Sequence, residues 1–174
     1  MSPQIQALID HYQFERLPVE GTLFKNTYRS AEQTPQGGPI ATAMIGLYLH
    51  EPESLSCFHR LTFDEVWHFY GGDPLELHLL FPDGSAERIL MGPEPLKGHH
   101  IQYHVPAGVW QGACLSEQGT YALFGCTMAP GFRGDCFEAG LAERLLEQYP
   151  AQAKIIRKLS VNGQATKMPA GFEG

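Results

Sequence analysis

The sequence predicts an all-β domain, a sandwich or barrel of antiparallel strands. Three observations support this fold class. Residues 20–128 are rich in β-branched and aromatic side chains, and Gly, Pro and Asp turns interrupt them at intervals of about eight to twelve residues. Apolar residues at helical spacing occur only before and after this segment. We therefore expect one domain over residues 1–174, with a barrel over about residues 20–130.

The strands follow from runs of alternating or β-branched residues between turn signals. Gly71–Pro74, Pro82–Gly84, Pro106–Gly108 and Glu117–Gly119 are such turns, because Gly, Pro and Asp favour the backbone angles that reverse a chain. We expect strands at residues 21–28, 42–49, 55–61, 65–70, 75–81, 86–91, 101–105, 112–116 and 121–127.

A helix is expected at each end of the barrel. Ser2 is suited to cap the first helix and Pro3 fits its first turn, and Pro18 lies beyond its end. A second helix is expected over residues 138–149, where leucines recur at helical spacing before Pro150. The remaining tail is polar and contains Gly and Pro, so we expect residues 165–174 to be mobile.

Composition and charge exclude several classes of partner. A net charge of −7 argues against a nucleic acid or an anionic membrane surface. No apolar run approaches the length of about 18 residues that a transmembrane helix needs, and the first residues do not resemble a signal peptide. The four cysteines form no CxxC pair and no metal-binding spacing. These features predict a cytoplasmic protein with reduced thiols.

A candidate pocket follows from strand parity around residue 60. Residues two apart on a strand share a face, so His59 points the same way as Leu61, and Glu65 shares a face with Trp67 and Phe69. A turn at residues 62–64 would bring these two rows side by side. An imidazole and a carboxylate would then share a pocket walled by aromatic rings, as small-molecule sites often do.

These residues resemble the first motif of the cupin superfamily, G-x5-H-x-H-x3,4-E-x6-G. His59, Glu65 and Gly72 stand at its first His, its Glu and its closing Gly. Leu61 replaces its second His. The chain therefore carries only part of this motif.

The second cupin motif, G-x5-P-x-G-x2-H-x3-N, is also matched in part. Pro106 and Gly108 fit, whereas Gln111 replaces the His and Leu115 replaces the Asn. The chain is more similar to the cupin-5 family over about residues 5–148. The shared strings are FHR at 58–60, DEVWH at 64–68, VPAGVWQ at 105–111 and GCTMAPGF at 125–132.

The resemblance implies an RmlC-like jelly roll, a double-stranded β-helix, in a family that is commonly dimeric and has no established activity. Most cupin enzymes hold a metal through three His and one Glu, and this chain lacks two of those His. We therefore expect no cofactor. If a metal is present, the resemblance places it on His59, Glu65 and Gln111.

Three functions remain open. The first is isomerase- or epimerase-like acid–base chemistry, without a metal, on a sugar-like or keto-acid substrate: His59 would be the base, Glu65 would orient it, and Tyr103 or Tyr121 would be the acid. The second is a non-catalytic cupin that binds or senses a small ligand. The third is a metal-dependent dioxygenase. In each case we expect a small-molecule ligand and a homodimer, and the residues expected to contact the ligand are Gln111, Trp67, Phe69 and Trp110.

Arg60 points away from His59 by strand parity, and we expect it to form an ion pair with a residue such as Asp64.

The simplest alternative to a functional site is that His59 and Glu65 form a buried hydrogen-bonded pair without any chemistry.

Overall fold

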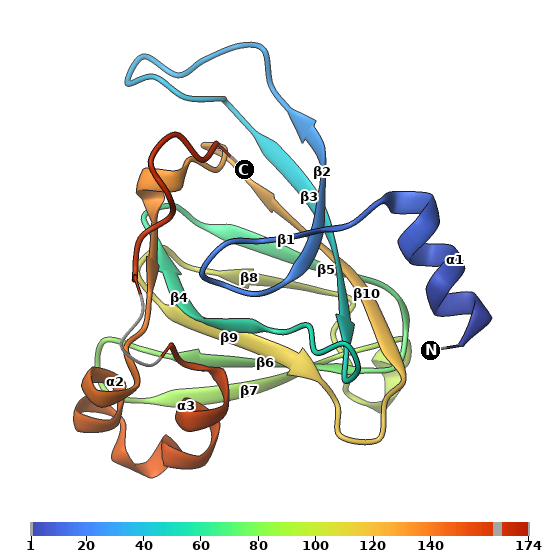
Figure 1. The fold of residues 1–174 in the computed structure, drawn as a ribbon. Helices are drawn as coiled ribbons and strands as arrows, with labels where there is room; N and C mark the ends of the chain where they lie inside the picture. Colours follow the sequence, from blue (N-terminus) through green and yellow to red (C-terminus); the bar gives the residue numbers. More distant parts are fainter. Residues whose placement is uncertain (1, 162–164, 174) are drawn as a thin grey trace.

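A computed structural model describes residues 2–161 and 165–173. In these residues the chain forms two facing antiparallel sheets (Figure 1), which confirms the all-β jelly-roll prediction. One sheet contains, in spatial order, β1 (Glu15–Arg16), β2 (Leu23–Arg29), β3 (Thr42–Leu49), β10 (Tyr121–Met128), β5 (Glu65–Gly72) and β8 (Gln102–Val105). The other contains β11 (Phe137–Ala139), β4 (Ser56–Leu61), β9 (Trp110–Leu115), β6 (Leu75–Leu80) and β7 (Ala86–Met91).

The helices lie outside the two sheets (Figure 1). They are α1 (Pro3–Tyr12), α2 (Ala142–Gln148) and α3 (Ala153–Leu159), with short 3₁₀ turns η1 (Pro95–Lys97), η2 (Gly134–Cys136) and η3 (Pro150–Gln152). The Ser2 Oγ accepts a hydrogen bond from the Ile5 N–H at 3.3 Å, which confirms the predicted cap. Within the described ranges, no helix has both the length and the hydropathy to cross a bilayer.

The helix expected over residues 138–149 is wrong at its start. Glu138 instead lies in β11, opposite Arg60 on β4, and α2 begins only at Ala142. The backbone explains the change, because the Gly140 N–H donates to the Phe58 carbonyl at 2.6 Å and the chain is thereby held against the sheet. Pro150 does not end the helical region, since it opens the turn η3 that leads into α3.

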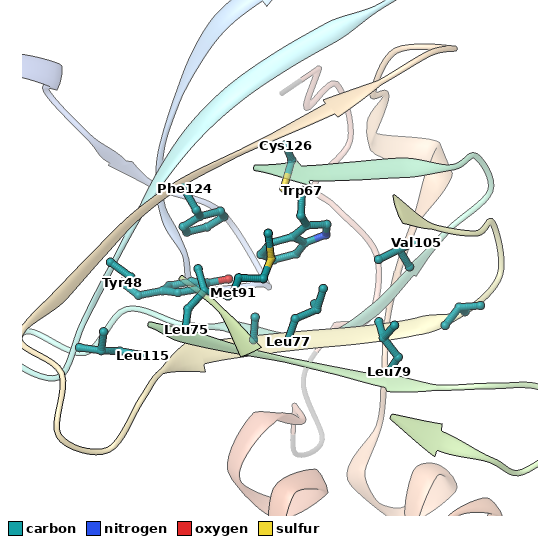
Figure 2. Packing of buried hydrophobic residues seen from close by; sticks show 13 residues of the cluster. Tyr48, Trp67, Leu75, Leu77, Leu79, Met91, Val105, Leu115, Phe124 and Cys126 are labelled. Atoms are coloured by element: carbon teal, nitrogen blue, oxygen red, sulfur yellow. The ribbon is translucent and has the colours of Figure 1, made fainter. Parts of the chain in front are cut away.

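The main hydrophobic core fills the space between the sheets at one end of the barrel (Figure 2). Trp67 on β5 stacks on Phe124 of β10 with ring centroids 5.1 Å apart. Leu75, Leu77 and Leu79 face them from β6, each fully buried, because alternate residues of a strand share one face. At the other end of the barrel the two sheets enclose a cavity.

Residues 165–173, called here the C-terminal strap, lie against this second end of the barrel. Met168 is buried, and the Phe172 ring lies near the rings of Phe24 and Phe132, with centroid separations of 6.5 and 6.3 Å. The sequence predicts a mobile tail here, and this stays a prediction, although Met168 and Phe172 of the described part contact the barrel. Its apolar residues are too widely spaced to form a pattern, and only the fold supplies the surface that they cover.

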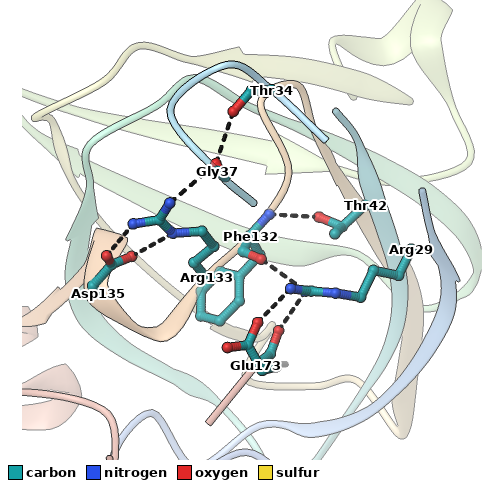
Figure 3. A network of polar contacts seen from close by, with 8 residues as sticks. All are labelled: Arg29, Thr34, Gly37, Thr42, Phe132, Arg133, Asp135 and Glu173. Atoms are coloured by element: carbon teal, nitrogen blue, oxygen red, sulfur yellow. Dashed lines mark hydrogen bonds and ion pairs between the residues drawn. The ribbon is translucent and has the colours of Figure 1, made fainter. Parts of the chain in front are cut away.

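Polar contacts link the strap to the barrel (Figure 3). Arg29, at the end of β2, forms an ion pair with the Glu173 carboxylate and donates to the carbonyls of Phe132 at 3.0 Å and Glu173 at 2.7 Å. Beside it, Arg133 forms an ion pair with Asp135. One arginine therefore joins β2, the segment after β10 and the end of the chain.

Candidate functional site

A cavity of about 60 Å³ lies between the two sheets beneath the C-terminal strap. Most of its wall is apolar, with aromatic rings, methionines and leucines from both sheets. The apolar lining residues are Leu17, Phe24, Ala43, Met44, Leu61, Trp67, Phe124, Cys126, Met128, Phe132 and Phe137. The polar lining residues are Glu20, Asn26, Thr42, Ser56, His59 and Glu65. An apolar wall with a few convergent polar groups is typical of a small-molecule site.

His59 and Glu65 reach this cavity from facing sheets, as their strand parity indicated. His59 on β4 is 3% exposed and Glu65 at the start of β5 is 8% exposed. Gln111 lies directly opposite His59 in the β4–β9 register. The three motif positions therefore lie within one interior, although Gln111 stands where the second motif has a histidine.

Gln111 connects Glu65 to the core. The Trp67 indole N–H donates to Gln111 Oε1 at 2.8 Å, and Gln111 Nε2 donates to Glu65 Oε2 at 2.8 Å. The indole can only donate, so it fixes the orientation of the amide and leaves the amide hydrogens facing the carboxylate. Gln111 thus holds Glu65 in place, while its own oxygen is occupied.

Glu65 is the most perturbed carboxyl group of the site. Burial, with a smaller contribution from the Glu20 charge, raises its pKa from 4.5 to about 7, although the charge of His59 and the hydrogen bond from Gln111 oppose the rise. At neutral pH this side chain is divided between its protonated and ionised forms. A carboxyl group in that state can both give and take a proton.

His59 lines the cavity, and one of its two ring nitrogens bonds to the backbone. Its Nδ1 lies 2.8 Å from the Cys57 carbonyl oxygen, which can only accept, so Nδ1 carries a proton. The ring stacks on Phe137 with centroids 5.2 Å apart. Within residues 2–161 and 165–173 no group hydrogen-bonds to Nε2, and in the neutral ring this nitrogen is a proton acceptor.

Glu20 is a site residue that sequence reasoning missed. It lies in the turn between β1 and β2, is 8% exposed, and places Oε2 at 3.9 Å from His59 Nδ1. A glutamate in a Pro- and Gly-containing turn is normally solvated, so no pattern indicated its burial. The preceding Val19 has φ of 65°, an uncommon conformation for a β-branched residue. Such strained backbone is often found at functional sites.

The two tyrosines considered as acids do not line the cavity. Tyr103 packs against the edge of the core and its hydroxyl donates to Glu87 at 3.2 Å. The Tyr121 hydroxyl accepts from Gln4 of α1 at 3.0 Å, at the opposite end of β10 from Cys126 and Met128. Neither hydroxyl is placed to exchange a proton with a ligand beside His59.

Two of the expected ligand contacts also lie elsewhere. Phe69 shares a face with Trp67 but packs farther along the core, outside the cavity lining. Trp110 points to the outer face, because its neighbour Gln111 points inward, and the Arg60 guanidinium lies 4.6 Å from its ring centroid. Arg60 forms the expected ion pair, but its partner is Glu138, at 2.9 Å, and not Asp64.

The residues present do not fit the metal centre of the superfamily. Leu61 cannot coordinate, and the Gln111 oxygen already accepts from the Trp67 indole. In the part of the chain that the structure describes, no group of three or more His, Cys, Asp or Glu side chains is arranged to hold an ion. The donors that remain at the motif positions, His59 and Glu65, fall short of the usual set of ligands.

Comparisons with known proteins agree with this fold. The chain is similar to a protein of Shewanella oneidensis, with 30% identity over 90% of this chain and 97% of that chain and a TM-score of 0.82. It is also similar to a hypothetical protein from Leishmania major, with 29% identity over 90% and 98% of the two chains and a TM-score of 0.80. No curated protein matches. A family model described as Cupin superfamily (DUF985) matches residues 6–140, and the chain therefore belongs to this cupin family.

Proposed function

We propose that this protein binds a small carbonyl compound in its inner cavity and isomerises it by acid–base chemistry that uses no metal. One observation carries the proposal: an imidazole whose Nε2 has no hydrogen-bond partner among the described residues and a carboxyl group with a pKa of about 7 line the same apolar cavity. Groups whose pKa lies near the working pH are effective in proton transfer.

The chemistry can be written with two protons. His59 Nε2 takes a proton from the carbon beside the carbonyl, and protonated Glu65 gives its proton to the carbonyl oxygen. The products are an enol, an imidazolium and a carboxylate. Return of the first proton to the other face of the same carbon, with the enol proton going back to Glu65, completes an epimerisation and restores both side chains.

The cavity favours a neutral compound with an apolar body over the sugar-like and keto-acid classes. A sugar carries a hydroxyl on most of its carbons, and a mostly apolar wall would leave several of them without partners. A keto acid would bring its own negative charge close to Glu20 and Glu65. A small ketone or aldehyde needs polar partners only at its carbonyl end.

The test begins with ligand-induced thermal shifts over neutral ketones, neutral sugars, small keto acids and nucleotide sugars. Compounds that bind are then incubated with the protein in D₂O, and exchange of the proton beside the carbonyl is followed by ¹H NMR. We expect His59→Gln to reduce exchange by about 10²- to 10⁴-fold while the fold survives. His68→Gln is the matched control, because His68 bonds to Thr127 outside the cavity.

A non-catalytic binding or sensing function is the alternative, and the same cavity supports it. It makes the opposite prediction for the exchange experiment. If His59→Gln binds the ketone as tightly as the wild type and exchanges its proton equally fast, the catalytic proposal is wrong and the binding function replaces it.

A further inference from the structure

Three buried hydroxyl groups form a chain that ends on Glu20. The Thr22 hydroxyl lies 2.6 Å from Glu20 Oε1, the Ser56 hydroxyl lies 2.8 Å from that of Thr22, and the Tyr48 hydroxyl lies 2.5 Å from that of Ser56. Thr22 and Tyr48 are fully buried and Ser56 is 1% exposed. The chain crosses between the two sheets, from the turn that holds Glu20 through β4 to β3.

The number of protons that the three hydroxyl groups can donate fixes the direction of their hydrogen bonds. Each hydroxyl has one proton to donate, and the Thr22 hydroxyl lies 2.6 Å from Glu20 Oε1 and 3.1 Å from the Leu55 carbonyl oxygen. The carboxylate is the nearer and the stronger acceptor, so Thr22 donates to Glu20. Once Thr22 has donated there, it can only accept from Ser56, and Ser56 can then only accept from Tyr48. All three protons therefore point toward Glu20, which is the arrangement that suits an ionised carboxylate at the end of the chain.

We propose that Thr22, Ser56 and Tyr48 hold Glu20 as a fixed negative charge, and that Glu20 is the positioning residue of the His59–Glu65 pair. The inference rests on the proposed function, and it assigns a different role to each of the two carboxyl groups. Glu20 stays charged and favours the imidazolium that forms when His59 takes a proton, while Glu65 keeps the proton that the reaction uses.

The distances support action through charge. Glu20 Oε2 lies 3.9 Å from His59 Nδ1, which is too far for a hydrogen bond, and Nδ1 already donates to the Cys57 carbonyl. At this separation, in a site shielded from water, the negative charge of Glu20 still strongly favours the positively charged form of the His59 ring. The Glu20 charge, after burial, also contributes to the raised pKa of Glu65.

Among the residues that the structure describes, the other ionisable groups near the pair do not supply this charge. Burial raises the pKa of each of them, so they remain neutral at physiological pH. They are Tyr48 on β3, Cys57 on β4, Cys126 on β10 and Cys136 in η2. Glu20 is therefore the group whose charge the pair experiences.

The experiment uses Glu65 as a reporter and needs no ligand. The side-chain carboxyl carbons of glutamate are labelled with ¹³C and titrated by NMR from about pH 4 to pH 9, and loss of one signal in Glu65→Gln assigns the reporter. We expect Glu20→Gln to lower the pKa of Glu65 by about one unit or more, because a neighbouring like charge has been removed. Thr22→Val should also lower the pKa of Glu65, because Glu20 loses the hydroxyl group that donates to it. Thr22→Ser keeps a hydroxyl group and should give the wild-type pKa.

The outcomes separate the parts of the proposal. An unchanged Glu65 pKa in folded Glu20→Gln would overturn the charge assignment. A wild-type pKa in Thr22→Val would overturn the hydroxyl chain. If no ketone exchanges deuterium while Glu20→Gln still shifts the pKa, the proposed function fails and the charge assignment stands. If exchange occurs and Glu20→Gln leaves its pH profile unchanged, the positioning role is wrong.

Discussion

Glu65 is a carboxyl group that the fold has taken out of water, and this sets the sign of its effect on stability. Burial above all raises its pKa to about 7 in the folded protein, whereas an unfolded glutamate titrates near 4.3. The folded state therefore binds the proton more tightly. The resulting stabilisation is fully present below about pH 4.3 and is lost as the pH rises through about 7.

At the residue scale, we expect Glu65→Gln to remove this dependence on pH. Relative to the variant, the wild type should lose about 3 kcal/mol of unfolding free energy between pH 4 and pH 8, which is the pKa difference converted to free energy. Urea denaturation at constant ionic strength across this range measures it. Glu117→Gln, in the exposed turn after β9, is the control and should follow the wild type. Parallel curves for wild type and Glu65→Gln would contradict the prediction.

At the scale of elements, the C-terminal strap matters because it lies over the rings at the mouth of the cavity. Phe172 lies against Phe24 and Phe132, which both line the cavity, and the ion pair between Arg29 and Glu173 links the strap to β2. Arg29 and Glu173 are 35% and 66% exposed, so their pair stabilises the closed strap by only about 0.2–1 kcal/mol. Such a contact can open readily.

We therefore expect weakening of the strap to expose Trp67, which lines the cavity. In a Trp110→Phe background, Trp67 is the remaining tryptophan, and acrylamide quenching of its fluorescence reports access. Glu173→Gln should raise the quenching constant by a factor of about 1.5 to 5, and Phe172→Ala should raise it more. High salt should raise it in the wild type and have little effect in Glu173→Gln.

The control for this experiment is the reverse background. In Trp67→Phe, the fluorescence comes from Trp110, which contacts Arg60 on the outer face. The quenching constant of Trp110 should be the same whether residue 172 is Phe or is changed by Phe172→Ala. Equal quenching of Trp67 in the wild type and in Phe172→Ala would show that the strap does not control access.

At the scale of the whole molecule, we expect a homodimer in which residues 1–30 cover an exposed edge of the barrel. Light scattering at micromolar concentration should give twice the chain mass of 19.3 kDa. Tyr28→Glu places a charge on β2 within this segment, where Tyr28 is 55% exposed, and should give the monomer. Tyr70→Glu, at a residue of similar exposure outside the segment, should leave the dimer intact. A monomeric wild type would contradict the prediction, and dissociation by Tyr70→Glu alone would place the contact on the outer face of β5.

The elements that depend on local pattern could be predicted from the sequence. The expected strands at 42–49 and 86–91 coincide with β3 and β7, because alternating apolar residues and flanking turns are properties of consecutive residues. Strand parity likewise indicated that His59 and Glu65 face inward, and both line the cavity. By the same parity Trp110 lies on the face opposite Gln111, outside the cavity lining.

Other features were decided only by the tertiary structure, because they depend on which strands become neighbours. Glu20 reaches His59 because the turn between β1 and β2 closes over β4, where the Cys57 N–H donates to the Glu20 carbonyl at 3.2 Å. The hydroxyl chain likewise joins residues from three separate segments. Tyr103 and Tyr121 were candidate acids that the sequence could not place, and both hydroxyls bond to residues outside the cavity. Strand period says which face a residue occupies. It does not say what lies across the barrel from that face, since contacts between strands distant in sequence are set by the order of the strands and the closure of the turns.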